Sequence, residues 1–575
     1  MSRSCSLGMS YFFASTLVAC FLVQRAKTLL TGGVHNGTSE APPSTAASVA
    51  RRKPYLVDLQ RESVPVRRQG KVASFKTTYS GLISVGSPAQ EFRVVFDTGS
   101  GHVILPAVEC ESEACVAHRR YNMAASKTAL AINVDGSIVE PGELCDQVTI
   151  GFGTGEVTGE FVQEKVCLGA GVTSAQDGTA IPCVDLRVVT AVEMSDQPFR
   201  SFSFDGIVGL GLKSLALEDG FSFFDVLSQA SEQIPQFGFF LTEGEAGERS
   251  ELAIGGYNQE RLLEPLAWTP VVMSDLGYWQ VQIKAIRVDG IPLDICSDGT
   301  CRGIVDTGTS HVGVPGSRHS DLMDMLTRPA DGMLDCRLAK APVVEFELPG
   351  VNITIDSSTY MRRLPLREGV SVGSDKGVHI STEISKSEHA VVEASESKSP
   401  VVEAGAPAAA TSSEVAVVGE EVEVVKRHCR PKLMPVTMPE PLGPNLFILG
   451  EPVLHRYYSV YDVNSMHVGF GLANNRRNTL DPSAMTDEVG ELPPEVDILL
   501  TQTYTSVSGG LDYEGSSLVQ VKSRVVRLKA RRVVRGEHQG FNMLEVESHV
   551  AEMTMTRHAG PRALQLPAPE ETANL

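Results

Sequence analysis

Two segments of the chain carry the same carboxylate-containing motif. Residues 96–106 read FDTGSGHVILP and residues 305–315 read VDTGTSHVGVP. Each segment places an aspartate, Asp97 or Asp306, after an apolar strand and before a glycine, where the backbone can turn sharply. If the two loops face one another, the two carboxylates cannot both be ionised without a large electrostatic cost, so they would share one proton.

A pair of carboxyl groups that shares one proton is suited to hydrolysis. The ionised member acts as a base toward a water molecule, and the protonated member donates to a carbonyl oxygen. This arrangement hydrolyses an amide without a covalent intermediate. A lone Asp-Thr-Gly triplet is usually only a turn in a loop, but two copies in matched apolar contexts indicate two related lobes that each supply one aspartate.

The surrounding segments predict a mostly β fold that positions these loops. Residues 77–96 alternate apolar and polar side chains on either side of Gly86, which is typical of a β-hairpin. Short apolar runs separated by glycines continue through the body of the chain. The best helical patterns are residues 223–233 and 320–326.

With these features the sequence resembles the pepsin-like aspartic proteases. The resemblance includes the segments TYSGLISVGSPAQEF at 78–92, FDGIVGLG at 204–211, FILGEP at 447–452, GYWQ at 277–280 and YYSVYD at 457–462. It covers about residues 75–365 and 428–474. It implies a bilobal fold, with two related β lobes and a central active-site cleft, and an aspartic endopeptidase.

The resemblance also implies roles for individual residues. Asp97 and Asp306 are the expected catalytic residues, and Ser100 and Thr309 are the hydrogen-bonding neighbours expected to hold the carboxylates coplanar. The remaining motif residues expected to support the site are Thr98, Gly99, Thr307 and Gly308. No cofactor is implied, and neither a His-Glu-x-x-His motif nor paired Cys-x-x-Cys motifs indicate a metal site. His102 and His311, five residues after each aspartate, are expected to pack behind the active site.

Residues 150–155, IGFGTG, fall where the family has its flap, a hairpin that closes over the substrate. The expected flap residues are Phe152, Gly153 and Thr154. The family usually pairs a flap tyrosine with a tryptophan after the first motif, whereas this chain has Phe152 and Ile104. Neither can form that hydrogen bond, so closure would depend on apolar packing. Phe152 and Phe204 are expected to line a pocket for large hydrophobic side chains.

Cysteine positions are consistent with the resemblance. It implies three disulfides: Cys110–Cys115, Cys296–Cys301 and Cys336–Cys429. Cys145, Cys167 and Cys183 remain, and either Cys145 or Cys183 could pair with Cys167. The odd number predicts one free or otherwise paired thiol.

The N-terminal region indicates entry into the secretory pathway. Residues 1–26 carry an uncharged apolar run and are typical of a signal peptide, with an uncleaved signal anchor as the alternative. Sequons at Asn36 and Asn352 predict glycosylation. We expect a secreted, vacuolar or lysosomal protein, or one that is anchored through this hydrophobic segment.

Residues 27–76 are interpreted as a linker followed by a basic prosegment. Eight basic and two acidic side chains lie within 51–76. We expect this segment to act as the enzyme's own inhibitor, held over an acidic cleft by ion pairs that acid weakens. The alternatives are cleavage after Arg67 and Arg68 by a dibasic-specific convertase, and a plain linker.

The rest of the chain divides into an N-terminal lobe at 77–270, a C-terminal lobe at 271–474 with a low-complexity insertion at 366–427, and an extension at 475–575. The extension contains a basic stripe: Lys522, Arg524, Arg527, Lys529, Arg531, Arg532 and Arg535. This stripe predicts an amphipathic strand or helix, or a site for an anionic surface.

The net charge of −20 argues against nucleic acid as a partner. The resemblance implies an endopeptidase that cuts polypeptides beside bulky hydrophobic residues at acidic pH, and we expect it to be a monomer. The alternatives are a pepsin-fold binding protein without activity and a membrane-anchored processing protease.

Overall fold

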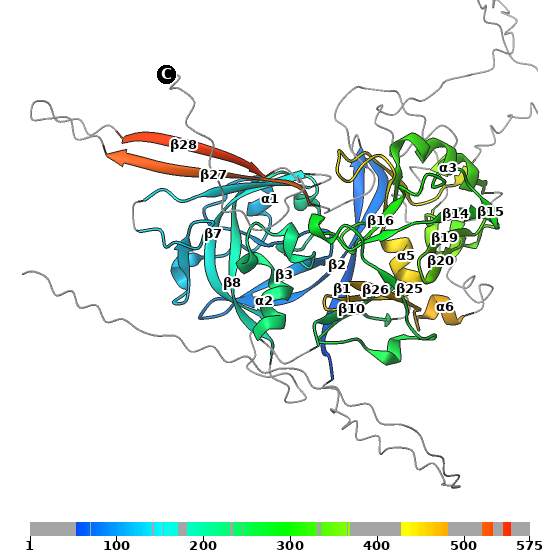
Figure 1. Ribbon diagram of the computed structural model, residues 1–575, viewed down its shortest axis with the longest axis horizontal. Coiled ribbons are helices and arrows are strands. Elements are labelled where there is room, and N and C mark those ends of the chain that lie inside the picture. Colours follow the sequence, from blue (N-terminus) through cyan, green and yellow to red (C-terminus); the bar gives the residue numbers. More distant parts are fainter. Residues whose placement is uncertain are drawn as a thin grey trace, which may run out of the picture. The chain divides into compact units, whose positions relative to one another are not determined.

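The computed structural model describes residues 53–68, 71–140, 143–152, 155–170, 181–230, 234–244, 247–330, 335–364, 366–367, 427–480, 520–532 and 544–553. These residues confirm the predicted mostly β fold, because they form twenty-eight strands in four sheets and only six short α-helices (Figure 1). The helices are α1 (Glu113–Val116), α2 (Phe223–Ala230), α3 (His319–Leu326), α4 (Ser357–Tyr360), α5 (Glu451–Arg456) and α6 (Arg476–Thr479).

The largest sheet has sixteen strands. Fifteen of them follow in the order β12 (Ala267–Pro270), β26 (His467–Leu472), β25 (Tyr457–Asp462), β10 (Gln236–Phe240), β11 (Ser250–Ile254), β1 (Tyr55–Arg68), β2 (Lys71–Val85), β3 (Gln90–Asp97), β9 (Gly206–Gly209), β4 (Val103–Pro106), β8 (Cys183–Met194), β7 (Gly155–Leu168), β6 (Gln147–Phe152), β27 (Gln520–Arg532) and β28 (Leu544–Met553). The sixteenth, β5 (Leu130–Ile132), pairs with β7.

Three smaller sheets complete the described part of the chain. A five-stranded sheet contains β13 (Gln280–Gln282), β16 (Arg302–Val305), β24 (Leu446–Leu449), β17 (Val312–Pro315) and β23 (Leu433–Val436). A four-stranded sheet contains β15 (Ile291–Pro292), β14 (Ala285–Val288), β19 (Val344–Leu348) and β20 (Val351–Ile355). A three-stranded sheet contains β18 (Arg328–Pro329), β22 (Arg427–Cys429) and β21 (Leu366–Arg367).

The sequence repeat appears in the connectivity of the strands. In the first half, β9 runs parallel to β3 and antiparallel to β4, and β4 runs parallel to β8. In the second half, β24 runs parallel to β16 and antiparallel to β17, and β17 runs parallel to β23. Each motif aspartate therefore follows or ends the equivalent strand of two related β units, as the two-lobe prediction requires.

The local predictions around the first motif are confirmed. Strands β2 and β3 form the predicted antiparallel hairpin, and Gly86 at its turn has a φ of 87°, which glycine adopts without a steric penalty. The two predicted helices are α2 and α3, although α2 is described only to Ala230. Both bury apolar side chains on one face.

An aromatic cluster lies near the junction of the two halves. Phe237 on β10 stacks on Tyr461 of β25 with 4.7 Å between ring centroids. Trp279 packs edge-on against both rings and donates its indole N–H to the carbonyl oxygen of Leu210, which follows β9. These buried contacts connect strands from both halves behind the catalytic loops.

Strand β1 lies within the segment interpreted as a linker and prosegment. Its first part pairs with β11 and the remainder with β2, so it is an interior strand of the large sheet. Val57 and Leu59 are buried in the main core. Arg61 lies 3.6 Å from Glu451, a buried carboxylate at the start of α5 that also contacts Tyr79 and His455.

The three implied disulfides are present, and the open pairing is settled. Besides Cys110–Cys115, Cys296–Cys301 and Cys336–Cys429, the structure joins Cys167 to Cys183, which lie opposite one another on β7 and β8. The alternative bridge from Cys145 to Cys167 is therefore wrong, and Cys145 is a free thiol.

Several predictions fall on residues outside the described part of the chain. These are the signal peptide, Asn36, the flap tip at Gly153 and Thr154, and most of the insertion. The two ends of the insertion lie side by side, because β21 at its start pairs with β22 at its end. Asn352 lies exposed on β20, where a glycan could be attached. No described helix is long and apolar enough to cross a membrane.

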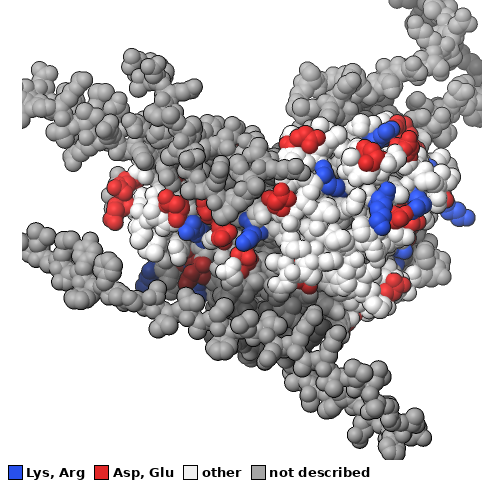
Figure 2. Space-filling view, in the orientation of Figure 1, with Lys and Arg blue, Asp and Glu red and all other residues white. Residues whose placement is uncertain are grey.

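Six of the seven residues of the basic stripe, from Lys522 to Arg532, lie on a strand, which is one of the two predicted forms, and Arg535 lies outside the described residues. Strand β27 pairs on one side with β28 and on the other with β6, and the pair extends the large sheet at the edge of the flap hairpin (Figure 1). On the face shown in Figure 2, acidic and basic side chains of the described residues lie interspersed.

Candidate active site

The two motif loops are joined by reciprocal hydrogen bonds. The Thr98 amide donates to Thr307 Oγ1 at 3.1 Å, and the Thr307 amide donates to Thr98 Oγ1 at 3.0 Å. Each hydroxyl in turn donates across to the other half: Thr98 to the carbonyl of Val305 at 2.9 Å, and Thr307 to that of Phe96 at 2.8 Å. The repeated motifs are therefore brought together, and both threonines are buried.

The two aspartates lie beside this connection and are fully buried. Within each loop, a glycine amide donates to its own aspartate at 2.9 Å: Gly99 to Asp97 Oδ1, and Gly308 to Asp306 Oδ1. A Cβ atom added to Gly99 would lie 2.7 Å from Asp306 Oδ1. The glycine is required here because the opposite carboxylate occupies the space of a side chain.

The electrostatics of the pair are asymmetric. Burial and the neighbouring Asp306 carboxylate hold the pKa of Asp97 well above its usual value. Burial also raises the pKa of Asp306, but the Thr309 hydroxyl, the carboxyl group of Asp97 and the amide of Gly308 counteract this by hydrogen bonding to its ionised form. Burial and repulsion between the carboxylates thus disfavour ionisation of Asp97, whereas the hydrogen bonds to Asp306 favour the ionised form of Asp306.

The two expected hydroxyl neighbours differ. Thr309 donates to Asp306 Oδ2, as the resemblance implied. Ser100 favours the ionised form of Asp97, but its hydroxyl has no partner with hydrogen-bond geometry among the described residues. Asp97 Oδ2 also has no such partner in the described part of the chain.

Two glycines allow the strands behind the loops to cross closely. A Cβ atom on Gly209 would lie 2.5 Å from the His102 nitrogen, and one on Gly450 would lie 2.3 Å from the His311 carbonyl oxygen. No side chain fits at these distances. Gly209 and Gly450 end the apolar segments that resembled the family, so this part of the resemblance has a steric basis.

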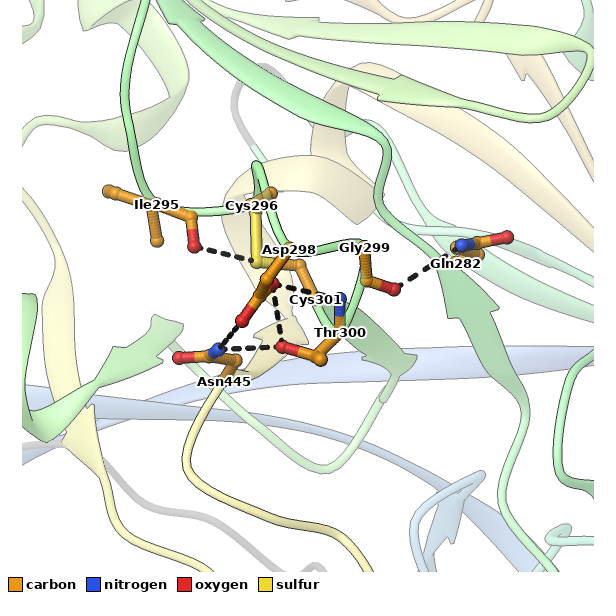
Figure 3. Close-up of a disulfide and its surroundings, with 8 residues drawn as sticks. All are labelled: Gln282, Ile295, Cys296, Asp298, Gly299, Thr300, Cys301 and Asn445. Atoms are coloured by element: carbon orange, nitrogen blue, oxygen red, sulfur yellow. Dashed lines mark hydrogen bonds between the residues drawn. A yellow bond between two sulfur atoms is a disulfide. The ribbon is translucent and has the colours of Figure 1, made fainter.

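The turn that leads into the second motif is fixed by a disulfide and a carboxylate (Figure 3). Between β15 and β16, Cys296 bonds to Cys301, and Asp298 Oδ1 accepts from the amide and hydroxyl of Thr300 at 2.9 and 2.8 Å. Asn445, just before β24, donates to Thr300 Oγ1 at 2.7 Å. These contacts tie the approach to β16 to the strand that crosses behind Asp306.

The flap strand carries Phe152, which is buried against Phe199 with 5.8 Å between ring centroids. Ile104 and Phe204 belong to the same apolar cluster, and Phe204 stacks on Phe202. The cluster therefore brings together three of the predicted substrate-binding residues. Its role in substrate binding stays a prediction.

His102 and His311 are both buried, as expected, but their surroundings differ. His311 contacts Ser310 and Arg362. His102 accepts a hydrogen bond from the Leu217 amide at its Nε2, 3.0 Å away, so its proton lies on Nδ1. Burial lowers the pKa of His102 to about 4, and the ring is neutral above that pH.

Sequence reasoning missed one residue at the site, Gln520 at the start of β27. Its amide donates to the Gly99 carbonyl at 2.9 Å, two residues from Asp97. Its carboxamide reaches Gly101 and His102, and Tyr278 donates to its backbone carbonyl. No sequence pattern indicated this contact, because Gln520 lies 419 and 418 positions from Gly101 and His102.

A model of the family described as eukaryotic aspartyl protease matches residues 78–369, just over half of the chain. The chain belongs to the eukaryotic aspartyl protease family. The family match begins in β2, within the hairpin that leads to Asp97, and extends past the second motif to the start of the insertion. The pepsin-like resemblance and the two-lobed β fold that it implied are therefore established.

Proteins similar in sequence to this chain include cathepsin E and pepsin A-5. Rat (Rattus norvegicus) cathepsin E is 34% identical over 290 residues, which are 49% of this chain and 66% of the relative. Xenopus laevis cathepsin E-B is 31% identical over 53% of this chain and 71% of the relative. Mouse (Mus musculus) pepsin A-5 is 31% identical over 54% and 76%. The chain thus spans just under two thirds of rat cathepsin E.

Proposed function

We propose that this protein is an aspartic endopeptidase that hydrolyses peptide bonds in polypeptides. The observation that carries the proposal is the buried pair of aspartates, held together by the reciprocal Thr98 and Thr307 hydrogen bonds and sharing a proton. Membership of the aspartyl protease family supports the same chemistry.

The asymmetry of the pair assigns a role to each carboxyl group. Asp306 is the base toward the attacking water, because Thr309 and the Gly308 amide stabilise its ionised form. Asp97 holds the proton and donates it to the peptide carbonyl through Oδ2. The water oxygen forms a bond to the carbonyl carbon, and its proton passes to Asp306. In the resulting gem-diol the C–N bond breaks as the amine nitrogen takes the proton from Asp306, and one gem-diol hydroxyl returns its proton to Asp97 as the carboxylic acid product forms, which restores the pair.

We also propose that the enzyme works in acid. The mechanism needs exactly one proton on the pair, so activity is lost when pH rises through the elevated pKa of Asp97. The buried cluster of Phe152, Phe204 and Ile104 supports a preference for bulky hydrophobic residues beside the scissile bond.

We also retain the proposal that residues 27–76 form a prosegment of a secretory-pathway zymogen. Its ion pairing is supported by Arg61, which lies 3.6 Å from Glu451. Removing Tyr55–Arg68 would take away a strand between β11 and β2, so maturation would require the sheet to rearrange. Sequencing the N-terminus of active protein after acid treatment tests this, because a start at residues 27–50 would exclude a removed prosegment.

The test of the function is cleavage of denatured globin by the purified protein between pH 3 and pH 7, with and without pepstatin. The proposal predicts acid activity that pepstatin inhibits, and cuts beside bulky apolar residues when the products are identified by mass spectrometry. A folded protein that has been freed of residues 1–68 and shows no activity in acid would favour the binding-protein alternative instead.

A further inference from the structure

Gln520, at the start of strand β27, hydrogen-bonds to the first catalytic loop through both its backbone and its side chain. The Gln520 amide donates to the Gly99 carbonyl at 2.9 Å, and Tyr278 donates to the Gln520 carbonyl. The backbone N–H and C=O of Gln520 are therefore both hydrogen-bonded, to Gly99 and Tyr278 respectively. Gln520 itself is buried, with 3% of its surface exposed.

The carboxamide of Gln520 is bound with a defined orientation. Its Oε1 accepts from the Gly101 amide at 3.3 Å and faces His102 Nδ1 at 3.1 Å, and its Nε2 donates to the Leu215 carbonyl at 3.1 Å. His102 Nδ1 carries the ring proton, because Nε2 accepts from Leu217. Two donors thus meet the oxygen and one acceptor meets the nitrogen, a pattern that fits an amide and not a carboxylate.

Strand β27 also takes up the open edge of the flap strand. Strand β6 pairs with β7 on one side, and its other side pairs with β27 in a register that places Gln520 opposite Phe152 and Val525 opposite Val148. Val525 is buried in the apolar cluster that contains Phe152 and Ile104. An extended polypeptide that added to this edge of β6 would have to hydrogen-bond to the same β6 backbone groups that β27 pairs with.

We propose that β27 occupies the substrate position in cis and inhibits the enzyme, and that a carboxamide site formed by Gly101, His102 and Leu215 recognises glutamine in the bound strand. The proposal rests on the endopeptidase function proposed above. A polypeptide that reaches Gly99, two residues from Asp97, must displace Gln520. Substrates that place glutamine in the carboxamide site compete with the extension most effectively.

The inhibitory part is tested with full-length Gln520→Ala and a fluorogenic peptide substrate. Loss of three side-chain contacts predicts that kcat/KM rises by about tenfold or more over wild type. Gln539→Ala, in the same extension, is the matched control and should leave kcat/KM unchanged. Equal kcat/KM values for the wild type and Gln520→Ala would overturn inhibition by β27.

The recognition part is tested with Gln520→Glu and Val525→Ala. Glutamate places a carboxylate oxygen against the Leu215 carbonyl, so Gln520→Glu should be activated as strongly as Gln520→Ala. Val525→Ala should be activated as well, because it weakens the packing of β27 on the flap cluster. A Gln520→Glu protein with the same low kcat/KM as wild type would refute the carboxamide site.

A measurement without catalysis separates this proposal from the proposed function. In full-length Asp306→Asn protein, amide hydrogen exchange of β6 residues 147–152 is compared with and without Gln520→Ala, and β25 serves as the folding control. We expect the β6 amides that face β27 to exchange at least about tenfold faster with Gln520→Ala. Unchanged exchange would refute docking of β27, whereas faster exchange in a protein that shows no activity in any variant would contradict the endopeptidase function alone.

Discussion

Thr98 and Thr307 hydrogen-bond to one another twice, each through its amide and its hydroxyl, although 209 positions separate them. The same hydroxyls also donate to backbone carbonyls of the opposite half. Four hydrogen bonds therefore pass between the two motif loops within a small buried region. They determine where the two aspartates lie relative to one another, which neither half could determine alone.

Replacing Thr98 by alanine should destabilise the protein by about 2–4 kcal/mol, because it leaves the Thr307 amide and the Val305 carbonyl buried without partners. Thr98→Ser keeps the hydroxyl and should lose less than about 1 kcal/mol. Equilibrium denaturation of both variants measures this, with the cleavage assay as a second readout. Equal stability of Thr98→Ala and Thr98→Ser would show that the hydroxyl does not hold the loops together.

Asp97→Asn should stabilise the protein at neutral pH. The raised pKa of Asp97 means that its contribution to stability is fully present below the unfolded-state pKa, about 3.9, and is lost as pH rises through the folded-state pKa. Asparagine does not titrate, so the variant should melt at least about 2 °C above wild type at pH 7, with a smaller difference at pH 3. Asp321→Asn, on the exposed side of α3, is the control and should show no such trend.

Glu451→Ala should lower the free energy of unfolding by about 3–5 kcal/mol, because it leaves Arg61, Lys432 and His455 without their buried carboxylate partner. Removing Glu345 from its more exposed pair with Arg287 should cost less than about 1 kcal/mol. Denaturant unfolding of both variants compares the two sites. Similar losses would mean that burial of Glu451 adds nothing to its ion pairs.

The same carboxylate gives a pH trend of the opposite sign to Asp97. Despite burial, Lys432, His455 and Arg61 hold the pKa of Glu451 well below its usual value. Its contribution to stability is therefore present above the unfolded-state pKa, about 4.3, and is lost as pH falls toward the folded-state value. The stability difference between wild type and Glu451→Gln should shrink in acid, and a difference that grows in acid would contradict this assignment.

Cys145 should be the free thiol among the nine cysteines that follow Cys20. Burial, together with Glu160, raises its pKa to about 12, so little thiolate is present at pH 8. Iodoacetamide should label it at least about tenfold faster in denatured than in native protein. Peptide mapping without reduction checks the assignment, and a disulfide that contains Cys145 would contradict it.

Much of this architecture could be predicted because its signals are local. The hairpin that leads to Asp97 is indicated by alternation of side chains around Gly86, and the repeated motif indicated two related halves. The position of strand β1 could not be predicted from its charge alone. Its basic residues suggested a segment lying over the cleft, whereas the apolar side chains of Val57 and Leu59 place part of it in the core.

Gln520 could not be predicted from the sequence. Its partners Gly101 and His102 are 419 and 418 positions away, and the extension carries neither the repeated motif nor a resemblance to the family. A glutamine in a polar tail has no pattern of its own that signals burial. Only the three-dimensional arrangement of β27 against the flap strand reveals this contact.

The central claim is that Asp97 and Asp306 together hydrolyse peptide bonds, and it is tested most directly by globin cleavage across pH 3 to pH 7 for wild type, Asp306→Asn and the control Asp321→Asn. We predict acid activity in wild type and Asp321→Asn that falls by at least about a thousandfold in Asp306→Asn, while all three remain folded. Equal activity of Asp306→Asn and wild type would contradict the account.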